Sequence, residues 1–494
     1  MSNKIHIILD NVYAKIIGAS KDIEFAIWNE LSFAVEEFGQ DHVTQRHLFN
    51  RKTKKTYAGL IPYVERILKE AQVDYDIVDS RIRPEENADF SLVKEIDIGG
   101  GKKIPLTARK YQEKIMKNCE PRECLQAATG AGKTFMMAGI IAKFNVKPVM
   151  VFADKMSLVS QIKEEFEKFL GVEVGIIGGG MKVIKDITIC SVQSAVNEDE
   201  LLKDAKMIMF DECHHLPSNT MNEVATKADN AYFRIGVSAT PWRDGGDDLL
   251  IEAILSKRKP EHSINASKLI DLGYLVPATI YFVPMKQAFQ GKTYHTVYKK
   301  AIVENKDRNE AIVKIANKML VTRSMTTLIL IQHVAHGEIL QKMLFELIPE
   351  ESFTMTVANP KTGKEQLVRV RNIEFLSGKD DPIRRKAVIQ ATKEKRVKIL
   401  IGSTIADEGL DVPSLDCLIL AGGGKSSTRA FQRIGRVLRL FKDPITGEEK
   451  KRAICFDFQD FTPMLRRHAR VREKLYLTEE KWDIKYFNPA LLQD

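Results

Sequence analysis

The stretch Ala127-Ala128-Thr129-Gly130-Ala131-Gly132-Lys133-Thr134 decides the fold of this chain. It follows a short apolar segment and precedes an apolar stretch of helical spacing that begins at Phe135. Small residues before a helix let backbone N–H groups wrap around phosphates, and the helix N-terminus adds its dipole. Lys133 is expected to reach the β- and γ-phosphates of ATP, and Thr134 to hold Mg²⁺. Ala127 occupies the place of the usual first glycine, so a chance glycine-rich helix start is the alternative. The residues expected to cradle the nucleotide are Thr129, Gly130, Ala131, Gly132, Lys133 and Thr134.

A second informative element is the apolar run Met207 to Phe210, which ends in Asp211-Glu212-Cys213-His214. A βαβ fold presents its ligands at the carboxyl ends of its strands. Asp211 is therefore expected to hold Mg²⁺ through water, and Glu212 to orient and deprotonate an attacking water. An acidic loop after a strand is the alternative. Because the two elements occur together in this order, they predict ATP hydrolysis.

Short apolar runs alternate with amphipathic segments from Leu106 to Leu255 and again from about Thr326. This alternation predicts two α/β units in tandem, each with a parallel sheet. Before them, residues 4–9, 12–17 and 75–78 read as strands, residues 22–38 and 60–71 read as helices, and residues 47–58 read as a hairpin with a polar turn. The expected domains are 1–90, 91–258 and 259–494, in line with about three domains for 494 residues.

Composition narrows the class of protein. Hydrophobic residues make up 44% and charged residues 29%, which argues against a disordered chain. The net charge of +9 weakly favours a polyanionic partner. No apolar run approaches the roughly 20 residues of a membrane span, and the start is not a signal peptide. None of the six cysteines has zinc spacing, and reduced thiols are expected. We therefore expect a soluble, cytoplasmic protein, in the host cytoplasm if a phage encodes it, without a membrane partner.

Several further motifs resemble those of superfamily-two helicases of the DExH type, over roughly residues 104–475. Leu106 to Gln112 resembles the adenine-recognition segment, which implies that Gln112 reads the adenine edge and that Arg109 lies near the base. An amide suits this role because it both donates and accepts. Ser238-Ala239-Thr240 resembles the motif that couples nucleotide state to nucleic-acid grip, so Ser238 and Thr240 are its expected residues.

The second α/β unit carries the remaining motifs of this resemblance. Residues 402–411 resemble the fifth motif, which implies that Thr404 touches a backbone phosphate and that Gly409 and Asp411 approach the nucleotide. Residues 432–439 resemble the sixth, which places Gln432 at the nucleotide. Arg436 and Arg439 are expected to share a helix face and to neutralise charge on the γ-phosphate. Arginine fingers of this kind can contribute about 10³–10⁵ in rate. The resemblance implies RecA-like domains, with a solvated basic helix face as the alternative for the arginines.

The N-terminal module and two departures refine the resemblance. Tyr57 to Leu60, a helix, and Tyr75 to Asp79 are similar to the small DNA-binding domain of UvsW-like phage helicases of recombination and branch migration. Residues 153–158 lack the usual Pro-Thr, and Ser191 stands where Thr is commoner, although Gln161 is retained. These changes concern nucleic-acid contacts and leave the ATP motifs intact.

Basic residues predict where DNA lies. The polar turn and its flanks contain Arg46, Arg51, Lys52, Lys54 and Lys55, and they are expected to contact phosphates together with Gln161 and Thr404. Residues 353–371 predict a second hairpin, with Lys361 and Lys364 near its tip, that either separates strands at a fork or decorates the surface. The C-terminal run Arg466, Arg467, His468, Arg470, Arg472 and Lys474 either tracks a backbone or solvates a helix.

The expected protein is thus a monomeric, ATP- and Mg²⁺-dependent DNA helicase that remodels forks and Holliday junctions. Its expected partner is branched or double-stranded DNA that it tracks along a single strand, with single-strand-binding or recombination proteins as further candidates. The alternatives are a double-stranded DNA translocase subunit, an RNA helicase and a non-catalytic DNA-binding scaffold.

Overall fold

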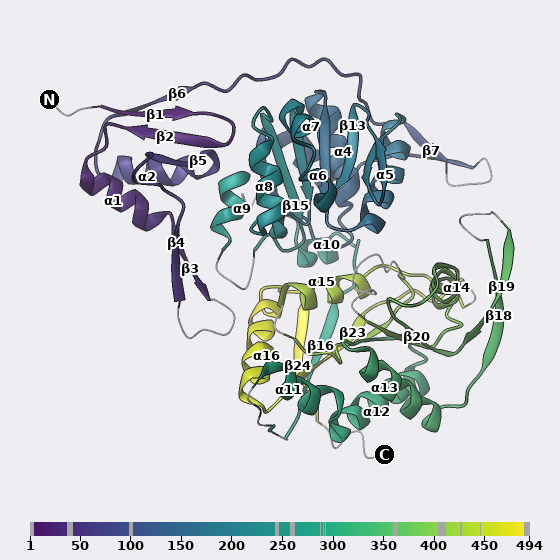
Figure 1. Ribbon diagram of the computed structural model, residues 1–494. Helices are drawn as coiled ribbons and strands as arrows, with labels where there is room; N and C mark the ends of the chain where they lie inside the picture. The colour runs from purple at the N-terminus through teal and green to yellow at the C-terminus, as the bar shows by residue number, and fades with distance from the viewer. Residues whose placement is uncertain are drawn as a thin grey trace. The chain divides into compact units, whose positions relative to one another are not determined.

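The computed structural model divides into two compact units, Met1–Ile264 and Asn265–Asp494 (Figure 1). It describes residues 4–36, 43–97, 102–242, 247–256, 262–286, 288–289, 291, 293–358, 364–403, 412–424, 427–444 and 446–488. Among the described helices, none is long and apolar enough to cross a membrane.

The N-terminal module of the first unit is a four-stranded sheet covered by two helices (Figure 1). Strand order is β5-β2-β1-β6, with β1 parallel to β6 and antiparallel to β2. Alternate residues of β1 (Ile5, Ile7 and Leu9) are buried because successive side chains of a strand point to opposite faces. The elements are β1 (Ile5–Leu9), β2 (Tyr13–Ile17), α1 (Lys21–Glu30), β5 (Lys55–Tyr57), η1 (Ala58–Leu60), α2 (Ile61–Glu70) and β6 (Tyr75–Asp79).

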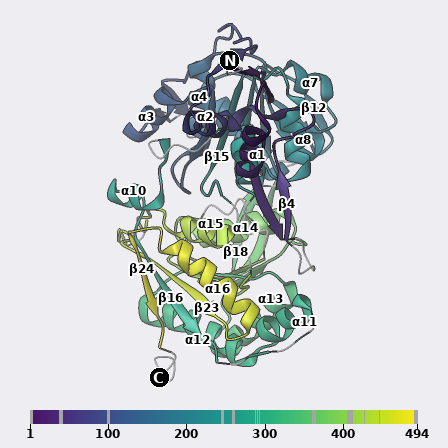
Figure 2. The same ribbon diagram turned by 90° about the vertical axis from the view of Figure 1, so that its left-hand side faces the viewer.

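Two local predictions for this module are wrong. The helix expected over residues 22–38 ends at Glu30, and Ser32–Glu36 forms β3, which pairs antiparallel with β4 (Val43–His47). The two sides of the hairpin expected over residues 47–58 do not pair as strands. β5 pairs with β2 instead, and within residues 47–58 only Asn50 and Lys55 form a bridge across the turn. The projecting hairpin of the module is therefore β3–β4 (Figures 1 and 2).

The module is fastened to the first parallel sheet. Gly59 packs so closely that an added Cβ would collide with the carbonyl oxygen of Glu252. The Tyr63 hydroxyl donates to the Glu252 carboxylate, and the Arg122 guanidinium donates to the carbonyl oxygens of Ile254 and Asn11. These contacts hold η1 of the module against α9.

The first parallel sheet has the order β12-β11-β13-β10-β14-β15-β9. All its neighbours pair in parallel except β11 with β12. The strands β10 and β13 are buried along their whole length, as expected for a sheet covered on both faces. The elements around this sheet are α3 (Lys110–Asn118), β9 (Arg122–Gln126), α4 (Lys133–Phe144), β10 (Val149–Ala153), α5 (Met156–Leu170), β11 (Gly175–Gly178), β12 (Met181–Val183), β13 (Ile187–Ser191), α6 (Val192–Ala195), α7 (Asp199–Asp204), β14 (Met207–Asp211), η2 (Cys213–His215), α8 (Asn219–Lys227), β15 (Phe233–Ser238) and α9 (Leu249–Ile254). Before α3, β7 (Glu95–Asp97) and β8 (Lys103–Pro105) form a separate antiparallel pair.

The second unit holds another seven-stranded sheet, β20-β21-β17-β22-β23-β16-β24, whose pairings are all parallel. Helices α12 and α13 pack into its apolar core, and α16 lies along β23 (Figures 1 and 2). Its elements are α10 (Ala266–Asp271), β16 (Ala278–Pro284), α11 (Tyr294–Tyr298), a π-helix (Lys299–Val303), α12 (Lys306–Arg323), β17 (Thr327–Leu330), α13 (Val334–Leu347), β18 (Ser352–Ala358), β19 (Glu365–Arg371), β20 (Ile373–Leu376), α14 (Pro382–Lys393), β21 (Ile399–Gly402), β22 (Cys417–Ile419), α15 (Ser427–Val437), β23 (Ala453–Gln459), α16 (Pro463–Tyr476) and β24 (Trp482–Tyr486).

The prediction of two tandem parallel-sheet α/β units is confirmed. The hairpin expected over residues 353–371 is also present, since β18 and β19 pair antiparallel from Ser352–Arg371 to Ala358–Glu365. All six cysteines are buried and free, as expected of reduced thiols.

Candidate nucleotide site and nucleic-acid surfaces

The phosphate-binding loop predicted from the sequence connects β9 to α4. Gly130 and Gly132 have φ of 89° and 78°, a left-handed conformation that glycine adopts without strain. A Cβ on Gly132 would lie 2.6 Å from Gln112 Nε2. Ala127 needs no such freedom, because it pairs with Ile264 as a strand residue and its N–H donates to the Ser238 carbonyl at 2.8 Å. The loop therefore tolerates alanine at position 127 but requires glycine at position 132.

Three side chains from the start of α3 hold the carbonyl groups of this loop. Tyr111 Oη and Gln112 Nε2 each donate to the Ala131 carbonyl at 2.8 Å, and Arg109 Nη1 donates to the Gly130 carbonyl at 3.2 Å. Because the C=O and N–H of a trans peptide point in opposite directions, the Gly132 N–H points away from α3. Gln112 is buried against the loop, so its role at the adenine stays a prediction.

The acidic residues predicted for hydrolysis lie at the carboxyl end of β14, between β10 and β15. Glu212 has a left-handed φ of 49°, which is uncommon outside glycine and is typical of functional sites. Its carboxylate forms an ion pair with Lys133 and accepts a 3.0 Å hydrogen bond from Ser238 Oγ. Thr240 N–H donates to Ser238 Oγ at 3.1 Å. The structure thus brings the loop lysine, the acid and the coupling motif into one network.

His214 completes this network, with Nδ1 3.0 Å from Ser238 Oγ and 3.4 Å from Glu212 Oε2. The sequence contained a signal for it, since His214 is the last residue of the Asp-Glu-Cys-His run. Tyr111 was also missed as a functional residue, although it lies between the two residues expected at the adenine.

The two neighbouring carboxylates differ in charge environment. Desolvation raises the pKa of Asp211 to about 6, against the opposing charge of Lys133. Desolvation also acts to raise the pKa of Glu212, but Lys133 and His214 outweigh it and hold that pKa well below its usual range. A desolvated carboxylate is stabilised by a bound cation. With Thr134 in the first turn of α4, the residues present fit ATP with Mg²⁺.

A second glycine-rich loop, Ala421 to Gly424, follows β22 in the second unit and precedes α15. Its carbonyl oxygens accept hydrogen bonds from four side chains. The donors are Arg308 Nη2 to Ala421 (3.0 Å), Tyr298 Oη to Gly422 (2.6 Å), Gln332 Nε2 to Gly423 (3.3 Å) and Arg472 Nη1 to Gly424 (2.8 Å). We call this set the carbonyl clamp.

Buried ion pairs fix two members of the carbonyl clamp. Arg308 pairs with Asp460 at 2.7 Å, and Arg472 pairs with Asp457 at 2.7 Å. The expectation that Arg472 belongs to a DNA-tracking or solvated basic run is therefore wrong, because its guanidinium is buried on Asp457 and Gly424. No motif in the sequence marked Arg308, Tyr298 or Asp457.

The expectation that Arg436 and Arg439 share a helix face is also wrong. Helix α15 ends at Val437, and the backbone of Arg439 pairs with Leu275 instead. Gln432 and Arg436 lie on the helix and are half-buried. Of the other residues expected near the nucleotide or phosphate, Thr404, Gly409 and Asp411 lie outside the described part of the chain.

The residues expected to contact DNA lie mainly at the surface. Arg46, Arg51, Lys52 and Lys55 are exposed in the N-terminal module, whereas Lys54 forms an ion pair with Glu24. Gln161 is exposed on α5 and donates to Glu165 at 2.9 Å. Lys364 is exposed at the start of β19, and Lys361 lies outside the described residues.

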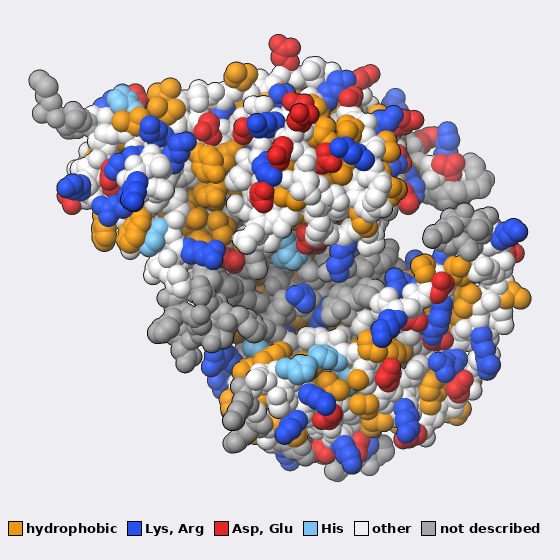
Figure 3. Space-filling view, viewed as in Figure 1, with side chains coloured by type: hydrophobic (Ala, Val, Ile, Leu, Met, Phe, Trp, Pro, Cys, Tyr) orange, Lys and Arg blue, Asp and Glu red, His pale blue; other side chains and the backbone are white. Residues whose placement is uncertain are grey.

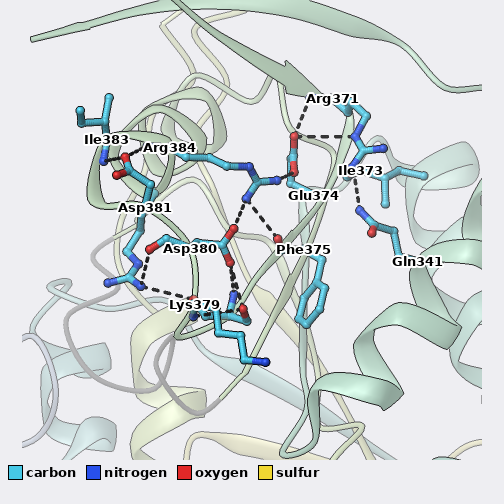
Figure 4. A network of polar contacts seen from close by, with 12 residues as sticks. Gln341, Arg371, Ile373, Glu374, Phe375, Lys379, Asp380, Asp381, Ile383 and Arg384 are labelled. Carbon is cyan, nitrogen blue, oxygen red and sulfur yellow. Dashed lines mark hydrogen bonds and ion pairs between the residues drawn. The ribbon is translucent and has the colours of Figure 1, made fainter. Parts of the chain in front are cut away.

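The base of the β18–β19 hairpin is held by a polar network around the buried Glu374 (Figure 4). Its carboxylate accepts from the Arg371 backbone N–H at 2.8 Å and from Arg384 Nη2 at 2.6 Å. Arg384 also pairs with Asp380 at 2.6 Å. Burial raises the pKa of Glu374, and Arg384 and Arg371 oppose that rise. The end of β19 is thereby joined to β20 and α14.

Comparisons with known proteins agree with this arrangement. Residues 105–243 match the family described as type III restriction enzyme, res subunit, and residues 336–441 match the helicase conserved C-terminal domain. The chain is 28% identical to DNA 3'-5' translocase XPB2 of Sulfurisphaera tokodaii, over 75% of this chain and 84% of that protein. It is 24% identical to the ATP-dependent DNA helicase uvsW of Enterobacteria phage T4, over 64% of this chain and 62% of that protein.

A solved structure shares the fold. The fragment of a putative HsdR subunit of a type I restriction enzyme from Vibrio vulnificus YJ016 has a TM-score of 0.55 and 15% identity, covering 92% of both chains. The prediction of two RecA-like domains is confirmed. One family match lies on each parallel-sheet unit, so the chain is similar to the superfamily-two helicases, which are ATP-dependent helicases.

Proposed function

We propose that this protein is an ATP-dependent DNA helicase that remodels forks and Holliday junctions by branch migration. The observation that carries the proposal is the network of Lys133, Glu212 and Ser238, which joins the phosphate-binding loop and the acid to the coupling motif. The choice of DNA follows the printed names of the relatives, a DNA translocase and a DNA helicase, and the basic N-terminal module. We also propose an origin in a T-five-type phage, on the resemblance of the N-terminal module to UvsW-like phage helicases.

The residues of the site divide the chemistry of hydrolysis among them. Lys133 positions the β- and γ-phosphates, and Glu212, ionised because of its low pKa, accepts a proton from the attacking water. Thr134 and Asp211 would hold Mg²⁺, which would neutralise charge on the phosphates. Ser238 contacts Glu212 directly, so a change at the carboxylate reaches Thr240 through a single hydroxyl.

The proposed grip on DNA combines charge and shape. Exposed Arg46, Arg51, Lys52 and Lys55 contact phosphates, and Gln161 contacts one strand on the first parallel-sheet domain. The β18–β19 hairpin separates strands at the junction, because the Glu374 network fastens its base while Glu365, Gln366 and Leu367 at its far end are exposed. Arg436 is proposed to neutralise charge on the γ-phosphate, with Gln432 beside it.

Other functions are open to the same core. A double-stranded DNA translocase subunit would carry these ATP motifs, and so would an RNA helicase, since one relative is a putative ATP-dependent RNA helicase of a mimivirus. A non-catalytic scaffold is disfavoured by the intact contact between Lys133 and Glu212.

The test compares ATP-dependent unwinding of a DNA fork, a Holliday junction, a blunt DNA duplex and an RNA duplex by the full chain. We expect forks and Holliday junctions to be processed fastest, and Lys133→Ala to abolish activity because the phosphates lose their positioning charge. Translocation along blunt duplex without junction processing would instead support the translocase, and preference for the RNA duplex would support the RNA helicase.

The same assay separates the roles of the hairpin. Replacing residues 354–370 with a short Gly-Ser turn should spare DNA-stimulated ATP hydrolysis and sharply reduce unwinding, because a wedge acts only where strands part. Survival of both activities would make the hairpin decorative, and loss of both would make it structural.

A further inference from the structure

The N-terminal module carries a column of planar side chains that the helicase motifs do not explain. The rings of Trp28 and His47 are nearly parallel, with an interplanar angle of 9° and centroids 3.5 Å apart. Phe25 also stacks on Trp28, with ring centroids 5.8 Å apart and an interplanar angle of 29°, and the Arg51 guanidinium lies 6.0 Å from the Phe25 centroid. We call the rings of Phe25, Trp28 and His47 the aromatic column.

Local structure explains why the column forms. Phe25 and Trp28 are three residues apart on α1, so they lie on the same face of the helix. His47 ends β4, and its Nδ1 lies 3.0 Å from the carbonyl oxygen of Trp28, which fixes the imidazole plane against the indole. Trp28 packs against the core of the module, whereas Phe25 is 53% exposed. Trp28 thus anchors the column to the module, and Phe25 is its most exposed ring.

The surroundings of the column favour a polyanion. Arg46, Arg51 and Lys52 are exposed beside it. Figure 3 shows hydrophobic and histidine side chains among Lys and Arg side chains on the part of the first unit that Figure 1 labels α1 and β4.

The acidic residues of α1 are largely neutralised. Glu24 forms an ion pair with Lys54, and Glu30 forms one with Arg66. Asp22, in the first turn of the helix, is the remaining acid of α1. A nucleic-acid backbone can therefore approach this face without meeting a row of free carboxylates.

We propose that Phe25 is the outer step of a stacking platform for an unpaired nucleobase, with Arg46, Arg51 and Lys52 on the adjoining phosphates. Only an unpaired base offers a free π-face, because bases inside a duplex are covered by their neighbours. The inference rests on the proposed function and deepens it, since the module would engage the single-stranded segments of a junction rather than duplex backbone alone. An aromatic platform is tolerant of sequence because every base has a π-face.

The experiment measures equilibrium binding of the full chain, without nucleotide, to three probes about 12 nucleotides long. The probes are oligothymidylate, an abasic strand with the same phosphates, and a blunt DNA duplex. Phe25→Ala should weaken binding of oligothymidylate about 5- to 150-fold, which corresponds to about 1–3 kcal/mol per stacked base. Affinity for the abasic strand and the duplex should not change. Phe25→Tyr should restore base-dependent binding.

Two controls keep the result specific. Leu272→Ala removes an equally exposed side chain, also 53% accessible, from the second unit and should leave all three affinities unchanged. In a variant whose other tryptophans, Trp242 and Trp482, are replaced by Phe, oligothymidylate should change Trp28 fluorescence and the abasic strand should not. Equal losses on base-bearing and abasic strands, or no loss with Phe25→Ala, would overturn the platform.

The binding assay needs no ATP, so its outcome is separate from that of the unwinding assay. Base-dependent binding without unwinding would refute the proposed function and support the platform. Unwinding with binding that ignores the bases would do the reverse.

Discussion

Two glycine-rich loops, one in each unit, are held by the same kind of contact and differ in where that contact comes from. Each follows a strand of a parallel sheet and leads into a helix that carries a basic residue of interest, Lys133 in one case and Arg436 in the other. In both loops, side chains donate to backbone carbonyl oxygens. A loop whose carbonyls are bound on one side has its orientation fixed before any ligand arrives.

The donors to the first loop are local. Arg109, Tyr111 and Gln112 lie within about 20 residues of the carbonyls that they bind, in a segment that resembles a known motif. The donors to the second loop are distant in sequence. Tyr298 is 124 residues from Gly422, and Arg308 is 113 residues from Ala421.

This difference determines how each loop can fail. The first loop depends on the half-exposed Arg109 and Tyr111 and the buried Gln112, all close to the proposed nucleotide, so its loss should appear in ATP binding. The second depends on buried groups that tie α11, α12 and α16 to one turn, so its loss should appear in the stability of the second unit.

The largest expected effect concerns Glu212, the acid that forms an ion pair with Lys133 at the end of the first loop. Glu212→Gln should still bind ATP but hydrolyse it about 10²–10⁴-fold more slowly, because an amide cannot accept the proton of water. Steady-state ATP hydrolysis at saturating DNA measures the change. Glu200→Gln, an exposed acid of α7 in the same domain, is the matched control and should retain full turnover. Near-normal turnover by Glu212→Gln would show that another group is the base.

A smaller effect is expected when one tyrosine hydroxyl that donates to each loop is removed and the losses of stability are compared. Tyr298→Phe leaves the buried Gly422 carbonyl without this donor and should lower the free energy of unfolding by about 1–3 kcal/mol. Tyr111→Phe removes a half-exposed hydrogen bond to Ala131, which water can partly replace, and should cost only about 0.5–1.5 kcal/mol. Hydrogen exchange of peptides covering each loop, together with the KM for ATP, measures the pair.

The comparison predicts opposite profiles for these two variants. Tyr111→Phe should raise the KM for ATP and leave exchange around Gly422 unchanged, whereas Tyr298→Phe should speed that exchange and spare the KM. If Tyr298→Phe shifts the KM as much as Tyr111→Phe does, the two loops are not separable in this way.

The same contrast explains what the sequence could reveal. The phosphate-binding loop and the Asp211-Glu212 pair could be predicted because each is contiguous and ends a buried strand. The carbonyl clamp could not, since Arg472 resembled a solvated helix residue until Asp457 was placed beside it. Arg439 was wrongly predicted to lie on the helix for a similar reason. Its backbone pairs with Leu275, a residue distant in sequence, and α15 ends before it.

The N-terminal module shows the limit of periodicity. Apolar residues continue at helical spacing past Glu30, yet the chain turns at the buried Leu31 and pairs Ser32–Glu36 with β4. Strand pairing over a distance overrides local spacing here. The aromatic column could therefore not be predicted from the sequence, because it depends on the β3–β4 pairing that brings His47 next to Trp28.

The smallest expected effect concerns protonation of Asp211, the carboxylate at the end of β14. The pKa of Asp211 is raised to about 6 by desolvation, while Lys133 and His214 lower it and Glu212 raises it. A carboxyl is neutral below its pKa, so Asp211 loses its charge for Mg²⁺ as the pH falls through about 6. Glu212, with its low pKa, stays ionised over this range and does not contribute to the change. From pH 7 to pH 5 the ionised fraction of Asp211 falls about tenfold, and kcat/KM for ATP should fall with it. Raising the Mg²⁺ concentration should move the decline to lower pH, because the cation favours the ionised form. A rate that stays flat down to pH 5, or a decline that ignores Mg²⁺, would show that Asp211 does not hold the metal.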